Sequence, residues 1–239
     1  MRIATAAIVF AAWRRPWRFV LTASASQRGL LCALGAVLGL MNVVFYLAIE
    51  RLPLATVGAI EFLGPIVLAA IGARSARNIA ALVVAVLGVW LLTDVRWVAE
   101  PMGLAFAFAN CVLFMLYIVL GHRIAADGGA SGIDRLAAAM LIALVVASPM
   151  GLLQALPALT NVALLAAGAA VGICSSVIPY VCDQLAMARL SRATFALLLS
   201  LLPATASLIG VVVLGQVPSA GEVLGIALVV VGVGLHRAR

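Results

Sequence analysis

Long apolar segments follow one another along almost the whole chain, with short turns between them. The 239 residues are 66% hydrophobic and only 10% charged, whereas a soluble domain has about 25% charged residues. So few charges cannot cover a water-soluble fold of this size, but they suit a protein that is solvated by lipid. Each later segment is close to the roughly 20 apolar residues that a helix needs to span a bilayer. The pattern predicts an all-α, polytopic membrane protein.

Nine apolar segments are expected to form helices, and only the first is too short for a full span. Arg, Pro, Gly and other polar residues mark the turns, including those at residues 14–18 and 154–157. No linker indicates a separate soluble domain. The expected helices cover residues 1–13, 28–49, 53–73, 78–94, 101–122, 132–153, 161–187, 191–214 and 220–236.

The 15 basic residues are all arginines, and their distribution predicts the topology. Twelve fall in one set of alternate turns, and three (Arg2, Arg51 and Arg96) fall in the other. By the positive-inside rule the richer set faces the cytoplasm. We therefore expect a multi-pass protein of the cell (inner) membrane with a cytoplasmic C-terminus and an N-terminus outside. Single and paired arginines between apolar runs argue against nucleic acid as a partner.

The sequence repeats itself at an offset of 138 residues. Residues 48–71 and 186–209 are identical at eight of 24 positions, including an arginine, a threonine and a proline in register. A repeat of five helices gives two copies of opposite orientation, an arrangement of transporters whose substrate site lies near the bilayer midplane. We expect repeats at residues 1–97 and 98–239, from a ten-helix parent whose first helix is missing here.

Two carboxylates stand out deep inside the apolar segments, where a charge costs about 2.5–3.5 kcal/mol on insertion scales. Glu61 lies roughly eight residues into its helix, and Asp183 lies in the inner third of another. Each can be a proton-coupling or amine-binding group that faces a cavity. The alternative is a protonated or paired structural residue, and for Asp183 a side chain that reaches the inner interface.

Other polar side chains lie at similar depth, several of them spaced to share one face of a helix. They are Asn42, Tyr46, Asn110, Tyr117, Tyr180, Gln184 and Ser200. Any one of them can be explained by a hydrogen bond between helices, worth about 0.6–2 kcal/mol. As a set around the axis of the repeat, they are interpreted as the lining of a substrate path.

Three prolines, Pro65, Pro179 and Pro203, lie within expected helices, where each removes one backbone donor. Kinks at these positions would suit rocking of one repeat against the other, and the alternative is a tolerated transmembrane proline. Three GxxxG spacings are interpreted as packing motifs. They begin at Gly35, Gly168 and Gly221.

Enzyme motifs such as HExxH, GxSxG, a Walker loop and GxGxxG do not occur in the sequence. Both histidines, His122 and His236, lie at helix ends, and the four cysteines form no closely spaced metal-binding set. We therefore expect no enzyme activity, no metal and no cofactor.

Several motifs resemble the drug/metabolite transporter superfamily, and within it the EamA-domain exporters of the threonine/homoserine subgroup. The resemblance implies two inverted bundles of five helices around a central cavity, and export of amino acids or similar metabolites without ATP. Three acidic positions differ from the family pattern, at Asp183, Leu202 and Gln216. The motifs are residues 45–54, 60–65, 15–18, 178–180 followed by Asp183, and 192–195.

Together these features predict a secondary transporter of small polar metabolites, an amino-acid exporter that works by alternating access. Glu61 is the expected proton-coupling or amine-binding group. The alternative is a truncated, non-transporting paralogue that acts as a partner subunit. The lipid bilayer and a small-molecule substrate are the expected partners. The sequence neither predicts nor excludes a homodimer.

Overall fold

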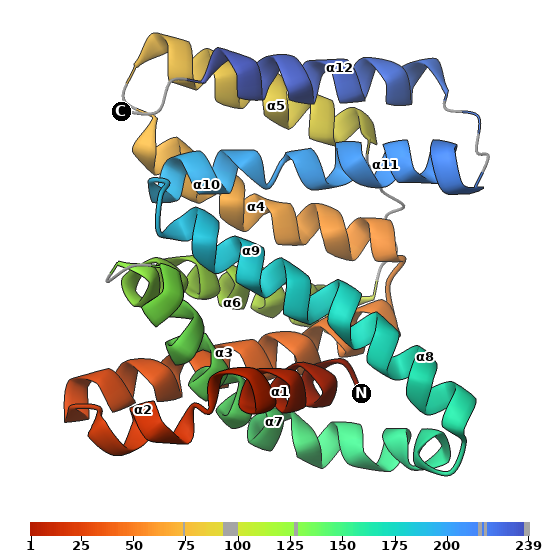
Figure 1. Ribbon diagram of the computed structural model, residues 1–239. Helices are drawn as coiled ribbons and strands as arrows, with labels where there is room; N and C mark the ends of the chain where they lie inside the picture. The colour runs from red at the N-terminus through yellow and green to blue at the C-terminus, as the bar shows by residue number, and fades with distance from the viewer. Residues whose placement is uncertain (74, 93–99, 127–128, 215–216, 218, 237–239) are drawn as a thin grey trace. The chain divides into compact units, whose positions relative to one another are not determined.

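The structure, a computed structural model, describes residues 1–73, 75–92, 100–126, 129–214, 217 and 219–236. Within these residues it is almost entirely helical and contains no β-strand (Figure 1). Arg96, Gln216 and the expected repeat boundary after residue 97 lie outside them. The helices are α1 (Arg2–Arg14), α2 (Trp17–Thr22), α3 (Ala25–Ile49), α4 (Leu54–Gly72), α5 (Ala76–Leu92), α6 (Pro101–Ala125), α7 (Gly129–Leu159), α8 (Val162–Gly172), the π-helix η1 (Ile173–Val177), α9 (Ile178–Met187), α10 (Arg192–Leu198), α11 (Leu201–Leu214) and α12 (Ala220–Leu235).

Each of the nine expected segments is mainly helical over its described residues. Among the described residues, five helices are long and apolar enough to cross a membrane, and three apolar helices are shorter. The all-α, multi-pass class predicted from the sequence is confirmed. The five long helices are Ala25–Ile49, Leu54–Gly72, Pro101–Ala125, Ser131–Gly151 and Val162–Met187.

The turn predicted at residues 14–18 is present at Arg15 and Pro16, but the sequence does not predict the short helix α2, which begins at Trp17. Helix α1 ends because Arg15 adopts the left-handed conformation, with φ 50°, and its N–H bonds the carbonyl of Ala11. Pro16 follows, and its fixed φ suits the start of a new helix. The chain therefore turns within two residues and becomes helical again.

The prediction of a turn at residues 154–157 is wrong, because α7 continues to Leu159. Proline removes only one intrahelical hydrogen bond near a helix end, so Pro157 does not stop the helix at once. The turn lies at residues 160–161, where the side chain of Asn161 accepts hydrogen bonds from the N–H groups of Ala163 and Leu164 and so caps α8.

Two of the three helical prolines lie next to irregular backbone. Pro179 cannot donate to the carbonyl of Ser175, and the chain widens just before it into η1, where the N–H of Ile178 bonds the carbonyl of Ile173. Pro203 cannot donate to the carbonyl of Leu199, and the expected helix 191–214 is interrupted there between α10 and α11. In contrast, α4 continues through Pro65.

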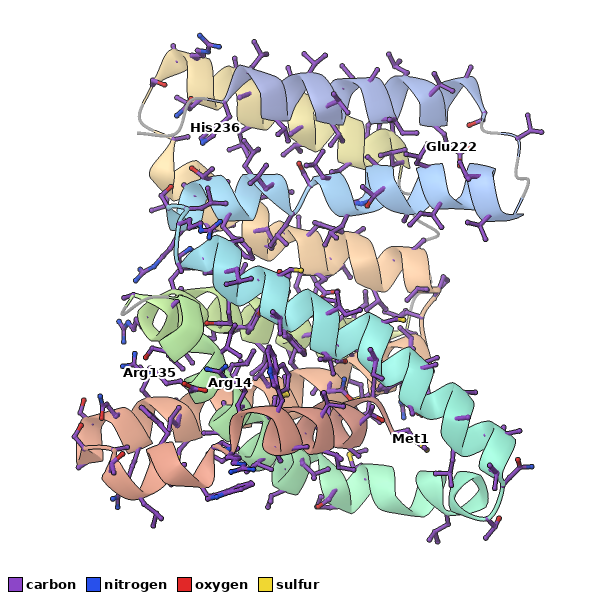
Figure 2. The ribbon with its side chains drawn as sticks, in the orientation of Figure 1. Met1, Arg14, Arg135, Glu222 and His236 are labelled. Atoms are coloured by element: carbon purple, nitrogen blue, oxygen red, sulfur yellow. The ribbon has the colours of Figure 1, made fainter. Side chains whose placement is uncertain are left out.

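One compact unit comprises residues 1–46 and 116–189. Within it α1 packs against α7, α8 and η1. Figure 2 shows Met1 and Arg14 at opposite ends of α1. The Arg14 end is fixed by an ion pair, with 2.5 Å between Arg14 Nε and Asp134 Oδ1.

The GxxxG spacing of α8 explains how α1 approaches this helix so closely. A Cβ atom built on Gly168 would lie 2.8 Å from the Met1 side chain, and one on Gly172 would lie 2.5 Å from the Thr5 side chain. Small residues allow such close packing in lipid, where helix association depends on van der Waals contact rather than on the hydrophobic effect. These contacts agree with the interpretation of the motif as a packing feature.

The other compact unit comprises residues 47–115 and 190–239, and α12 lies along α5 within it (Figure 1). A Cβ atom on Gly88 would lie 2.7 Å from the carbonyl oxygen of Gly225, which is a backbone atom and cannot move aside cheaply. Gly221, by comparison, has only the Ser219 side chain near it, at 3.9 Å. Gly225 is therefore the packing residue of its GxxxG spacing.

The units and the predicted repeats divide the chain differently. Each unit takes segments from both halves of the sequence, and α6 passes from one unit to the other between Met115 and Leu116. Units are defined by contacts and repeats by sequence, so the boundary between the repeats stays a prediction.

The packing of α5 on α12 gives the first testable prediction. Gly88→Ala should lower the melting temperature in detergent, because the added methyl group overpacks a backbone contact at a cost of about 1–3 kcal/mol. Gly234→Ala is the matched control, since no atom lies within 4 Å of the added Cβ. Melting curves test this, with size-exclusion chromatography used to measure the folded fraction at each temperature. Equal melting temperatures of the two variants would contradict the close approach of α5 and α12.

Candidate functional site

The predicted path residues fall into two groups, one in each compact unit. The first unit holds Asn42 and Tyr46 on α3, Tyr117 on α6, and Tyr180, Asp183 and Gln184 on α9, with Pro179 at the start of α9. The second unit holds Glu61 and Pro65 on α4, Asn110 on α6, Ser200 between α10 and α11, and Pro203 on α11.

A carboxylate and two tyrosines meet inside the first unit. The hydroxyl of Tyr117 donates a hydrogen bond of 2.8 Å to Oδ2 of Asp183. The ring of Tyr180 packs edge-to-face on that of Tyr117, with 5.7 Å between the ring centroids. Both tyrosines are buried, with 1% and 8% exposure. The structure therefore brings three of the predicted path residues together around one acidic group.

The spacing of residues on α9 explains this cluster. Tyr180, Asp183 and Gln184 stand three and four residues apart, so they lie on one face of the helix. Tyr180 and Gln184 are buried and Asp183 is partly buried. A carboxylate held by a phenol inside an apolar helix bundle can bind an ammonium group or exchange a proton.

Gln184 is fully buried, and neither atom of its amide has a hydrogen-bond partner among the described residues. Two glycines make room for it. A Cβ atom on Gly121 would lie 3.4 Å from Nε2, and one on Gly132 would lie 3.1 Å from Oε1. An unpaired buried amide costs about 1–3 kcal/mol, so it marks a place for a water molecule or a polar ligand group.

Asn110 in the second unit resembles Gln184 in this respect, because it is fully buried and both its amide atoms lack a partner among the described residues. Its neighbour on α6, Cys111, packs on α4, since a Cβ atom on Gly64 would lie 3.1 Å from the Cys111 carbonyl oxygen. Glu61 is partly buried on α4. Asn110 is thus a second buried polar group whose hydrogen bonds are not made by described protein atoms.

Ser200 is explained locally. Its hydroxyl donates a hydrogen bond of 2.6 Å to the carbonyl of Leu197, which stabilises the turn between α10 and α11. It borders an apolar hollow in which Pro65 and Phe62 also lie. Ser200 therefore supports the interrupted helix and adds little polarity to the hollow.

Two predicted path residues lie apart from the cluster of Tyr117, Tyr180 and Asp183. Tyr46 is 43% exposed and packs edge-to-face against its neighbour Phe45. Asn42 is partly buried. No described contact joins either residue to the acidic cluster, so their role in the path stays a prediction.

The sequence does not predict a contact that Arg2 makes with a distant helix. The distribution of arginines assigns Arg2 to the outer set of turns. In the structure Arg2 is the first residue of α1, and its Nε donates a hydrogen bond of 3.0 Å to the hydroxyl of Ser176 in η1. Ser176 is 1% exposed. In the sequence, the one signal for this contact is the position of Ser176, three residues before Pro179. A polar side chain beside a helical proline often forms hydrogen bonds with the backbone groups that the proline leaves free.

No group of three or more His, Cys, Asp or Glu side chains that could hold a metal ion occurs among the described residues. The chemistry that the described side chains offer is the binding of charged and hydrogen-bonding groups.

Comparisons with known proteins agree with these features. Residues 101–237 match the EamA-like transporter family. The chain is 33% identical over 234 residues to the threonine/homoserine exporter RhtA of Salmonella typhimurium strain SL1344, and 34% identical over 234 residues to that of Escherichia coli strain K12. Each alignment covers 96% of this chain and 77% of the relative. A protein of known crystal structure, 19% identical, has the same fold, with a TM-score of 0.70 over 98% of this chain and 85% of that one.

The hydrogen bond between Tyr117 and Asp183 gives the second prediction. Tyr117→Phe should destabilise the protein by about 0.5–1.5 kcal/mol, since it removes one hydrogen bond and keeps the ring packing. Tyr46→Phe, at an exposed position, is the control. Thermal unfolding of both variants, and of each combined with Asp183→Asn, measures the coupling. Additive effects of Tyr117→Phe and Asp183→Asn would contradict the bond.

Proposed function

The chain belongs to the EamA-like transporter family, and from that premise we propose that it exports threonine, homoserine or closely similar amino acids. The observation that carries the proposal is the partly buried carboxylate of Asp183, held by Tyr117 inside a helix of span length. A zwitterionic amino acid has an ammonium group that such a carboxylate can bind. The two exporters described above, aligned over 96% of this chain, support the substrate class.

Transport proceeds by alternating access in this proposal. The unpaired amides of Gln184 and Asn110 support it, because buried polar groups without partners become favourable when water or substrate reaches them. Proton coupling is assigned to Glu61, a partly buried carboxylate on α4. The chain acts in the inner membrane with a cytoplasmic C-terminus, in line with the excess of arginine in one set of turns.

The test of the proposed function is export from preloaded cells. Cells that express the chain should release threonine and homoserine faster than cells with an empty vector. Asp183→Asn should reduce the rate about tenfold or more, because the loss of a charged hydrogen-bonding partner costs roughly 1.5–3 kcal/mol. Glu50→Gln, whose side chain is 53% exposed, is the matched control. Absence of export while the protein is present in the membrane would contradict the proposal.

A separate prediction concerns Glu61. In membrane vesicles, an imposed pH gradient should accelerate threonine transport by the unchanged protein. Glu61→Gln should abolish this acceleration, because the amide cannot take up or release a proton. The rate measured without a gradient serves as the internal reference. Full retention of the pH-gradient response in Glu61→Gln would remove Glu61 from the coupling role.

A further inference from the structure

The guanidinium of Arg2 contacts the middle of a span-length helix. Helices α8, η1 and α9 run continuously over Val162–Met187, 26 residues. Ser176, which accepts the hydrogen bond from Arg2 Nε, lies about 21 Å from the Val162 end and about 17 Å from the Met187 end at the usual rise per residue. A positive charge is thus placed near the centre of an apolar helix.

This charge has no acidic partner in the described part of the chain. The ion pairs found there join Arg14 to Asp134 and Arg51 to Glu50. The described contact of Arg2 is to a neutral hydroxyl. Ionisable residues within membrane segments are costly, and where they occur they mark a substrate or ion pathway. An anion that binds Arg2 would supply the missing charge.

The backbone around Arg2 holds the side chain in place. Helix α1 is seated on the two glycines of α8, and its first turn lies beside η1. Short π-helical turns are rare and are frequent at functional sites. A guanidinium has five N–H donors, and the bond to Ser176 uses one, so its terminal nitrogens can hold a carboxylate through two parallel bonds.

The same helix carries the opposite charge two turns further on. Tyr180 follows Ser176 by four residues and Asp183 follows it by seven, which places them close to one face. Asp183 lies about 10 Å along the axis from Ser176. This separation exceeds the distance between the two charges of an α-amino acid. Arg2 and Asp183 would therefore each bind one charged group of the substrate, at different steps of its path.

We propose that Arg2 and Ser176 form the subsite that binds the carboxylate of the transported amino acid. The inference rests on the proposed export function and adds to it a specific contact for the acidic group of the substrate. It predicts that the transporter distinguishes an amino acid from its amide, which is similar in size and lacks the negative charge.

Uptake into inside-out membrane vesicles tests the subsite, with labelled threonine and labelled threonine amide compared. The unchanged protein should prefer threonine. Arg2→Gln should raise KM for threonine about tenfold or more, the change expected when a charged hydrogen bond is lost. It should leave transport of the amide unchanged, so that the preference disappears. Arg123→Gln, which removes an exposed arginine at the end of α6, should keep the preference.

The comparison of two substrates separates binding from a structural role. If Arg2 only holds α1 against η1, Arg2→Gln will reduce uptake of threonine and of the amide equally, and the inference is wrong. If Arg2→Gln does not fold, Arg2→Lys takes its place, because it keeps the charge but cannot form the two parallel bonds. This variant should show a raised KM for threonine alone, and an unchanged KM would overturn the inference.

The outcome also distinguishes the subsite from the export function itself. Uptake of threonine by the unchanged protein, combined with normal kinetics in the Arg2 variants, would overturn the subsite and leave the export function standing. No uptake by the unchanged protein, when it is present in the vesicles, would overturn the export function and the subsite with it.

Discussion

Lipid offers the backbone no hydrogen-bonding partner, and most of the described structure follows from that constraint. Every span must pair its own N–H and carbonyl groups, which makes it a helix. Where proline prevents this pairing, the chain repairs the loss locally. Beside Pro179 it forms the wider turn η1, and near Pro203 the carbonyl of Leu199 accepts instead from the N–H of Leu202 at 3.0 Å. These irregular turns fall within the apolar segments and close to polar side chains.

Packing between the helices depends on small residues and a few polar contacts. Glycines bring α1 onto α8 and α5 onto α12, so that side chains or backbone atoms touch directly. Hydrogen bonds such as that of Tyr117 with Asp183 add direction to this packing. In lipid such contacts replace the burial of apolar surface that holds a soluble core together. These polar groups face the interior of the helix packing, and the proposed function assigns substrate binding to them for that reason.

The sequence predicts the helices well because each span is a local property of about 20 residues. It also identifies Tyr117, Tyr180 and Asp183, since polar residues at depth are few. It does not predict the contact of Arg2 with Ser176, because these residues are 174 positions apart and no periodicity relates them. Helix α2 and the late end of α7 are missed for a different reason: proline and arginine mark a membrane boundary without fixing the residue at which a helix stops.

The π-helical turn η1 sets the rotational phase of the helix that contains it. A π turn holds more residues than an α turn. Compared with a regular α-helix of the same sequence, every side chain after Val177 is therefore rotated about the helix axis relative to the side chains before Ile173. This rotation lets one long helix present its glycines to α1 and its tyrosine and acid to α6. If the same residues were wound as a regular α-helix, Asp183 would be turned by about 100° relative to the glycines of α8. Regularity would be gained, and the alignment of the two faces would be lost.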